Sequence, residues 1–349
     1  MQKKFIVILA ISALLTAGIV TFGIYGYATA GKVENTFYYT YSSTGGEVED
    51  ININTDIGMV VINYNTTSME SYMEANINAS VEGLFIEGKP FEEFYNQPVT
   101  ANGSSTKTLE FSMKRDQWFN PSTWFSVRRV VINLTLRTDV VYNINVNVSL
   151  GTIVLNVPEN VTIGNLGLLS STGTVSVDLS ENTKINTVDI ETSTGKIELD
   201  SLKTNYTNGI DLTTSTGSIE VSLSNGIING DINTETSTGN SYVDIFNMTY
   251  ETNSVWSIRG STGNVFLNIE QDENMNANVS SSVIVSTGRI EVIYRDWSVN
   301  VGAKFVGSTS TGIIDADLPY ESLGFDSADY TYDFTLETST GNIIFAAIE

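Results

Sequence analysis

Carboxylates are the side chains of this sequence best suited to chemistry, and two closely spaced pairs are the best placed for it. Glu198 and Asp200 form one pair, and Asp315 and Asp317 form the other. Calcium takes oxygen ligands from carboxylates and carbonyls, so these four residues are the candidate calcium ligands. The sequence contains no EF-hand loop and no glycine- and aspartate-rich nonapeptide. We therefore favour a solvated acidic face, and expect no metal site and no cofactor.

The 349-residue chain contains neither Cys nor His. This excludes a Ser-His-Asp triad, a cysteine nucleophile, a disulfide framework and a thiolate or imidazole zinc site. A polysaccharide-acting enzyme that pairs Asp or Glu with Lys or Arg is the enzymatic alternative. Because basic residues are few, we predict that the protein is not an enzyme.

The charge balance is strongly acidic, with 17 Lys and Arg against 40 Asp and Glu and a net charge of -23. A surface of this sign repels phosphate backbones, so we expect no nucleic-acid partner. Charged residues make up only 16% of the chain, and the polar balance comes from Ser, Thr and 34 Asn residues.

The N-terminus carries the strongest signal for location. Lys3 and Lys4 are followed by an uncharged, largely apolar segment over residues 5–28, long enough to cross a bilayer of ~30 Å. The two lysines place residues 1–4 in the cytoplasm and the body of the protein outside. We expect a single-pass protein of the cell membrane, anchored by this helix. A cleaved signal peptide is the alternative, because Ala28, Thr29 and Ala30 fit a cleavage site.

The tripeptide Ser-Thr-Gly recurs with near-constant spacing. A degenerate member ends at Gly151, and successive glycines from there to Gly239 lie 22 residues apart. A fixed period of this kind indicates stacked supersecondary units. The structural turn glycines are predicted to be Gly45, Gly151, Gly173, Gly195, Gly217, Gly239, Gly263, Gly288, Gly312 and Gly341.

The residues around each glycine identify the unit. After Gly195, Ile197 and Leu199 alternate with polar residues, and before it Val188 and Ile190 do the same. Such alternation predicts half-buried strands on either side of a turn. A unit of 22 residues is too short for a βαβ motif or a propeller blade, and a sandwich needs no constant period. We predict an all-β fold, a parallel β-solenoid with rungs of about 22 residues.

The chain before the regular repeat has a different composition. We divide the exported part into an irregular β region over residues 31–150 and the repeat over 151–349. An aromatic insertion over residues 84–129 is expected to cap one end of the rod. Trp and Arg side chains anchor many interfaces, so the alternative is a contact surface formed by Arg115, Trp118, Phe119, Trp124, Phe125, Arg128 and Arg129.

Three further features concern partners. Tyr242 and Phe266 fall at equivalent outward positions of adjacent rungs and could stack on sugar rings, unless the register slips by one residue there. The uncharged last strand from Ile343 to Ile348 has no cap after it, so its open edge favours self-association. A candidate glycosylation site lies at each N-x-[ST] sequon, namely Asn65, Asn78, Asn102, Asn133, Asn147, Asn160, Asn205, Asn247 and Asn278.

Apolar strands punctuated by Ser-Thr-Gly every 22 residues, behind an apolar N-terminal segment, resemble the putative adhesin domain family of bacterial and archaeal surface proteins. The resemblance covers roughly residues 45–348 and implies a β-solenoid fold and a surface location. It brings no catalytic residues with it, and the insertion over residues 84–129 departs from the plain repeat. We predict a non-enzymatic adhesin-like protein that binds a surface protein or glycan; a self-assembling scaffold subunit is the alternative.

Overall fold

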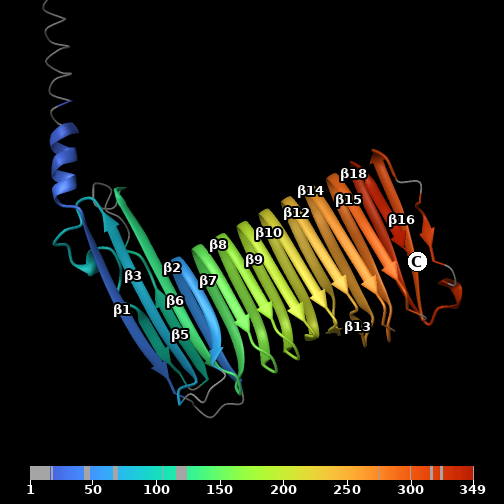
Figure 1. Ribbon diagram of the computed structural model, residues 1–349, viewed down its shortest axis with the longest axis horizontal. Coiled ribbons are helices and arrows are strands. Elements are labelled where there is room, and N and C mark those ends of the chain that lie inside the picture. Colours follow the sequence, from blue (N-terminus) through green and yellow to red (C-terminus); the bar gives the residue numbers. More distant parts are fainter. Residues whose placement is uncertain are drawn as a thin grey trace, which may run out of the picture.

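The protein is all-β, with strands that form one large and mostly parallel sheet (Figure 1). The structure is a computed structural model, and it describes residues 16, 19–42, 48–65, 70–103, 105–114, 124–273, 275–298, 300–314, 317–322 and 325–348. Within these residues, 19–28 are helical.

The strands differ in length between the two parts of the chain. Those before the regular repeat are β1 (Gly31–Tyr41), β2 (Val48–Asn65), β3 (Met73–Gly83), β4 (Val99–Asn102), β5 (Thr106–Phe111) and β6 (Ser126–Arg137), with the 3-10 helix η1 (Phe91–Glu93). The longest strands of the repeat are β7 (Val141–Val157), β8 (Thr162–Leu179), β9 (Lys184–Leu202), β10 (Asn205–Ser224), β12 (Ile232–Phe246), β14 (Ser254–Gln271) and β15 (Val279–Asp296). The remaining elements are β11 (Ile227–Ile228), β13 (Thr249–Tyr250), β16 (Val301–Thr311), β17 (Tyr320–Glu321), η2 (Phe325–Ser327), β18 (Tyr330–Thr340) and β19 (Ile343–Ile348).

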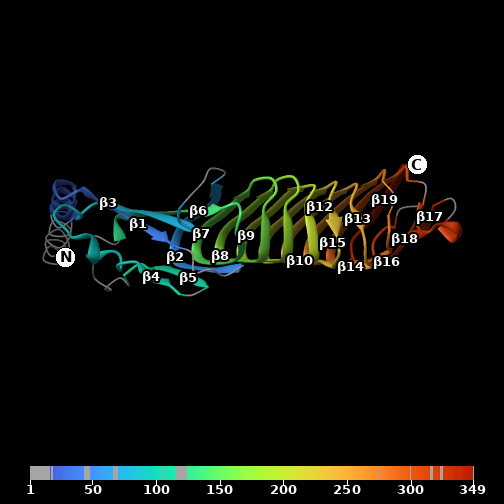
Figure 2. The same cartoon turned by 90° about the horizontal axis from the view of Figure 1, so that it is seen from below.

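Each long strand of the repeat bends once, at the Ser-Thr-Gly tripeptide or, in β7, at Ser-Leu-Gly. In β9 the inward residues Val188 and Ile190 precede the bend and Ile197 and Leu199 follow it, all four buried. The two halves of the strand lie in two layers and enclose one continuous apolar core (Figure 2). The tripeptide is therefore a corner within a continuous strand, where the sequence predicted a turn between two strands.

The rungs stack in parallel with their corners in register. Gly195 pairs with Gly217, and Gly217 pairs with Gly239, so these rungs lie 22 residues apart. A Cβ atom added at Gly217 would lie 1.6 Å from the carbonyl oxygen of Gly195, and the φ of Gly217 is 147°. Glycine is therefore required at this corner both by its backbone conformation and by the neighbouring rung.

A second column of corners returns the chain to the first layer. It consists of residues with positive φ between 48° and 62°, which are Asn160, Asn182, Lys203, Asn225 and Asn247. Each donates its backbone N–H to a carbonyl of the following rung, as Asn182 does to Lys203 at 3.1 Å. Asn tolerates the left-handed conformation better than other residues with a side chain. This column accounts for some of the abundant asparagine.

The order of rungs departs from the order of the sequence at both ends. At the start of the stack β2 pairs with β7, so that Gly58 meets Gly151 across 93 residues. Gly58, in a corner that reads Thr-Asp-Ile-Gly, therefore begins the glycine column, while Gly45 lies outside the described residues. The expected boundary between residues 150 and 151 falls within β7.

The outer side of β2 is covered by the strands formed by the intervening residues. β5 and β6 pair with it in parallel, and β3 and β1 continue from β6 as antiparallel strands. Lys107 of β5 and Glu49 of β2 form a fully buried ion pair, with 2.6 Å between Nζ and Oε2. Removing one partner of such a pair leaves an uncompensated charge in the core, so the pair fixes β5 against β2.

At the other end, the last two rungs stack in the reverse of their sequence order. β18 and β19 pair with β15, and β16 pairs with the outer side of β18. Tyr320 packs against Phe305 and Phe345, with ring centroids 6.2 and 5.1 Å apart, and η2 lies against β16. The sequence predicted an uncapped final strand, but internal residues cover this end of the core. Self-association through this edge stays a prediction.

The expected membrane anchor is not supported by the structure. In the part of the chain that the structure describes, no helix is both long enough and apolar enough to cross a bilayer. The helical residues 19–28 pack on the insertion through Phe22 and Phe85, with ring centroids 4.8 Å apart, and the rest of the predicted segment over 5–28 lies largely outside the described residues. The predicted single-pass location at the cell membrane is wrong on this finding.

Substituting a corner glycine is expected to damage the stack. Gly217→Ala places a Cβ on the carbonyl oxygen of Gly195 and should lower the free energy of unfolding by about 3 kcal/mol or more. Gly260→Ala is the matched control, because its nearest neighbour would be a Val285 methyl group at 3.5 Å. Chemical denaturation of both variants measures the difference, and equal stability would contradict the steric argument.

The lysine in the asparagine column offers a test in the stabilising direction. Lys203→Asn removes the backbone strain of a lysine in the left-handed conformation, but it also removes the exposed ion pair with Glu181, at 3.0 Å. We expect a net gain of about 0.5 kcal/mol in unfolding free energy. Lys184→Asn, in an extended strand, should bring no gain. A thermal melting temperature for Lys203→Asn at or below that of the parent would refute this account of the corner.

Candidate functional site

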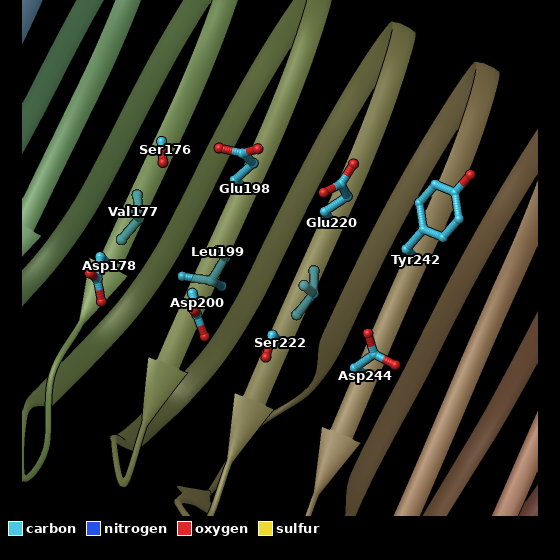
Figure 3. Close-up of a pocket in the computed structure, with 11 residues that line it drawn as sticks. Ser176, Val177, Asp178, Glu198, Leu199, Asp200, Glu220, Ser222, Tyr242 and Asp244 are labelled. Atoms are coloured by element: carbon cyan, nitrogen blue, oxygen red, sulfur yellow. The ribbon is translucent and has the colours of Figure 1, made fainter.

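A trough runs across the outward face of the strand segments that follow the glycine corners. On β8, β9, β10 and β12 the third and fifth residues after the glycine point away from the core, and their side chains line an open hollow of about 640 Å³ (Figure 3). Period-2 alternation fixes this orientation, since the residues between them are buried. We call the hollow the acidic trough; the outward residues that line it are Ser176, Asp178, Glu198, Asp200, Glu220, Ser222, Tyr242 and Asp244.

One cation already lies on this face. The ammonium group of Lys196 bridges Glu198 at 2.5 Å and Glu220 at 2.7 Å, on adjacent rungs. Hydrogen bonding to Glu198, and then to Glu220, raises the pKa of Lys196, and Lys196 in turn lowers the pKa of Glu198. The two carboxylates of this row therefore share one positive charge.

The neighbouring row of carboxylates has no such partner. Asp178 and Asp200 are register partners on adjacent rungs, and Asp244 lies two rungs beyond Asp200, after Ser222. All three aspartates are exposed, and among the described residues none forms an ion pair. Like charges on neighbouring strands repel, so this row is where the trough carries uncompensated negative charge.

The other layer of the rungs shows what such stacking does to a carboxylate. Asp189 is the register partner of Asp211. Partial burial, followed by the charges of Asp211 and Glu191, raises the pKa of Asp189. Repulsion between adjacent acidic residues therefore adds to the effect of burial on this carboxylate.

An aromatic pair closes one end of the trough. The rings of Tyr242 and Phe266 are stacked, with centroids 4.8 Å apart and an angle of 3° between their planes. The two residues are register partners, so the register does not slip at this rung, and Ser241 is buried against Thr236. Asn240 donates a hydrogen bond to the Tyr242 hydroxyl at 3.2 Å. A second hollow of about 260 Å³ adjoins the trough here, and Tyr242 and Asp244 line both hollows.

The structure does not bring the calcium candidates together. Glu198 and Asp200 lie on β9 in the middle of the stack, whereas Asp317 lies in the loop before β17 at its end, and Asp315 is outside the described residues. No group of three or more acidic side chains in the described ranges is arranged to hold a metal ion.

The predicted contact surface in the insertion is described only in part. Arg115, Trp118 and Phe119 lie outside the described residues, and Trp124 and Phe125 are exposed beside the start of β6. Arg128 and Arg129 lie on β6 itself, and none of these four lines the acidic trough. This surface therefore stays a prediction separate from the trough.

The predicted glycosylation sites fall in different environments. Asn247 is buried and accepts a hydrogen bond from the backbone N–H of Asp272 at 2.6 Å, in the asparagine corner column. Asn160 belongs to the same column. The side chains of Asn78 and Asn278 accept hydrogen bonds from Thr36 and Thr331. The sequons therefore include corner residues with a structural role, and glycosylation stays a prediction.

The solved structures that resemble the chain include three of low identity. They are a putative cell adhesion protein from Clostridium sporogenes (12% identity, 90% of this chain and 100% of that one, TM-score 0.26), a putative adhesin from Bacteroides fragilis (11%, 90% and 98%, 0.39) and a putative adhesin from Parabacteroides distasonis (9%, 89% and 97%, 0.34). No family model matches the sequence, and no curated protein matches it. TM-scores below 0.5 carry no argument, so function must be argued from the trough.

The Lys196 bridge makes the charge of the trough testable. Glu198 has a lower pKa in the folded than in the unfolded protein. The pair therefore stabilises the fold above the unfolded pKa of about 4.3, and this contribution is lost as the pH falls through the lower folded value.

In Lys196→Met the pKa of Glu198 should rise, and stability should fall less steeply between pH 5 and pH 3, a difference of about 0.5 kcal/mol or less because the pair is exposed. Carboxyl NMR titration measures the pKa directly, and Lys203→Met is the control. An unchanged Glu198 pKa would show that the bridge is absent in solution.

Proposed function

We propose that this chain is a non-enzymatic, adhesin-like protein, a parallel β-solenoid that binds a ligand in the acidic trough. The observation that carries the proposal is the combination within one hollow of a stacked aromatic ring, Tyr242, and three aspartates that form no ion pair among the described residues. Binding sites of this kind combine apolar or aromatic lining with a few well-placed polar groups.

The strands that carry the trough form a rigid scaffold, which suits ligand binding. Its lining residues stand on strands whose register is fixed by the glycine corners and by a continuous buried core. Side chains on strands of a rigid scaffold are held more precisely than side chains on loops. A ligand that spans several rungs therefore meets groups at the constant inter-strand distance of ~4.8 Å.

The arrangement of the carboxylates favours binding over glycoside hydrolysis. Hydrolysis needs an acid and a second carboxylate that flank the scissile bond. In the trough the carboxylates stand in rows on one face of one layer, and the two in the first row are tied to Lys196. The residues that line the trough all belong to one layer of β8, β9, β10 and β12, so none of its carboxylates faces another across the hollow from a second layer.

The test is a binding screen of the full chain against an array of neutral, acidic and amino-bearing oligosaccharides and of basic and acidic peptides. We expect at least one class to bind, and Tyr242→Ala to weaken that binding about tenfold, because stacking on an aromatic ring and its hydroxyl contact are lost together. Tyr38→Ala is the control, since Tyr38 is exposed on β1, away from the trough.

Three results would contradict the proposal. The first is binding that Tyr242→Ala and Tyr38→Ala weaken equally, and the second is no binding to any class. The third is cleavage of an oligosaccharide by the parent protein, detected as new products by mass spectrometry, which would replace a binding function by an enzymatic one.

A further inference from the structure

The seat of Lys196 shows which chemical group this face accepts. Its ammonium group lies between two carboxylates of adjacent rungs, within 2.7 Å of each. A cation at this position satisfies both side chains and removes the repulsion between stacked carboxylates. Lys196 is therefore an example, within the protein itself, of a cation bound between carboxylates of adjacent rungs.

The second row repeats that spacing without the cation. Asp178 and Asp200 are register partners on adjacent rungs, as Glu198 and Glu220 are, and Asp244 continues the row after Ser222. No lysine or arginine of the described residues reaches these three carboxylates. A cationic ligand would supply the positive charge that this row lacks among the described residues.

Tyr242 supplies a second contact for a cation at the end of the trough. Its ring lines the hollow, is stacked against Phe266 on the other side, and has its hydroxyl hydrogen-bonded to Asn240. A guanidinium group placed over a tyrosine ring gains a cation–π interaction. The same protein already makes this contact elsewhere, where the Arg137 guanidinium lies 4.8 Å from the centre of the Tyr72 ring.

The dimensions of the trough suit a short extended chain. It crosses four rungs, from β8 to β12, which corresponds to ~14 Å at ~4.8 Å per strand spacing. An extended peptide rises ~3.3 Å per residue, so four or five residues span this length. Alternate side chains of such a peptide point to the same side about every 7 Å and can reach successive carboxylates.

We infer that the acidic trough binds a basic peptide segment of a partner protein, with arginine or lysine side chains on Asp178, Asp200 and Asp244 and one guanidinium group over Tyr242. The inference rests on the proposed function, because it names the ligand class of the same surface. Charge complementarity favours a cationic chain over a neutral glycan, which the ring of Tyr242 alone would also accept.

The experiment uses the full chain and a fluorescent hexapeptide of alternating arginine and glycine with blocked ends. Fluorescence anisotropy at low salt should show binding that weakens steeply as salt is added, because exposed charges are screened. The double variant Asp200→Asn with Asp244→Asn should weaken binding about tenfold, and Tyr242→Ala several-fold. Glu235→Gln, on the other layer of β12, should leave binding unchanged.

Three further probes separate this inference from the proposed function. They are the same peptide with citrulline in place of arginine, a neutral cello-oligosaccharide and an amino-bearing oligosaccharide of glucosamine. Binding of the arginine peptide alone supports the inference. Tighter binding of either sugar, lost in Tyr242→Ala, would overturn the peptide but keep the trough as a binding site. Failure of all four probes to bind, or binding that no trough variant changes, would overturn both.

Discussion

The structure depends on one steric constraint at the corner of each rung. In the rungs from Gly151 onward, a Cβ atom on the corner glycine would lie 1.5–1.7 Å from a carbonyl oxygen of the adjacent corner glycine. Only glycine lets the two backbones approach this closely, and its positive φ turns the strand into the second layer. Because each glycine sits on its neighbour, the column sets the register of every rung, and every other side chain falls into a row.

The same register places like charges next to one another on the outward face. Equivalent positions stack at ~4.8 Å, so a repeated acidic residue becomes a row of like charges. The first row of the trough solves this with Lys196 and with the aromatic pair of Tyr242 and Phe266. In the second row only Ser222 interrupts the acidic residues, and its three aspartates have no counter-charge among the residues that the structure describes. A chain with net charge -23 has few cations to place there.

Sequence alone predicts the rung but not the order of rungs. The period of 22 residues and the alternation of apolar residues are local signals, and they correctly predict an all-β chain with inward and outward positions. The sequence does not identify Gly58 as a corner, because Asp56 and Ile57 stand where the repeat has Ser and Thr, and its partner Gly151 lies 93 residues away. The sequence also does not predict the exchange of the last two rungs. A repeat indicates that rungs stack in parallel, but it does not indicate which rung lies next to which. The 29-residue gap between Gly312 and Gly341 is the only trace of it.

The trough could be predicted residue by residue but not as a hollow. Glu198, Asp200, Tyr242 and Phe266 can each be assigned to outward positions from the repeat, whereas the hollow exists only because four rungs place short and long side chains next to one another. The corner glycines and inward aliphatic residues carry the fold, and the outward rows contribute little to it. Exchanges in those rows can therefore alter what the trough binds while the stack stays intact, which makes this face the part of the rung where recognition can change independently of stability.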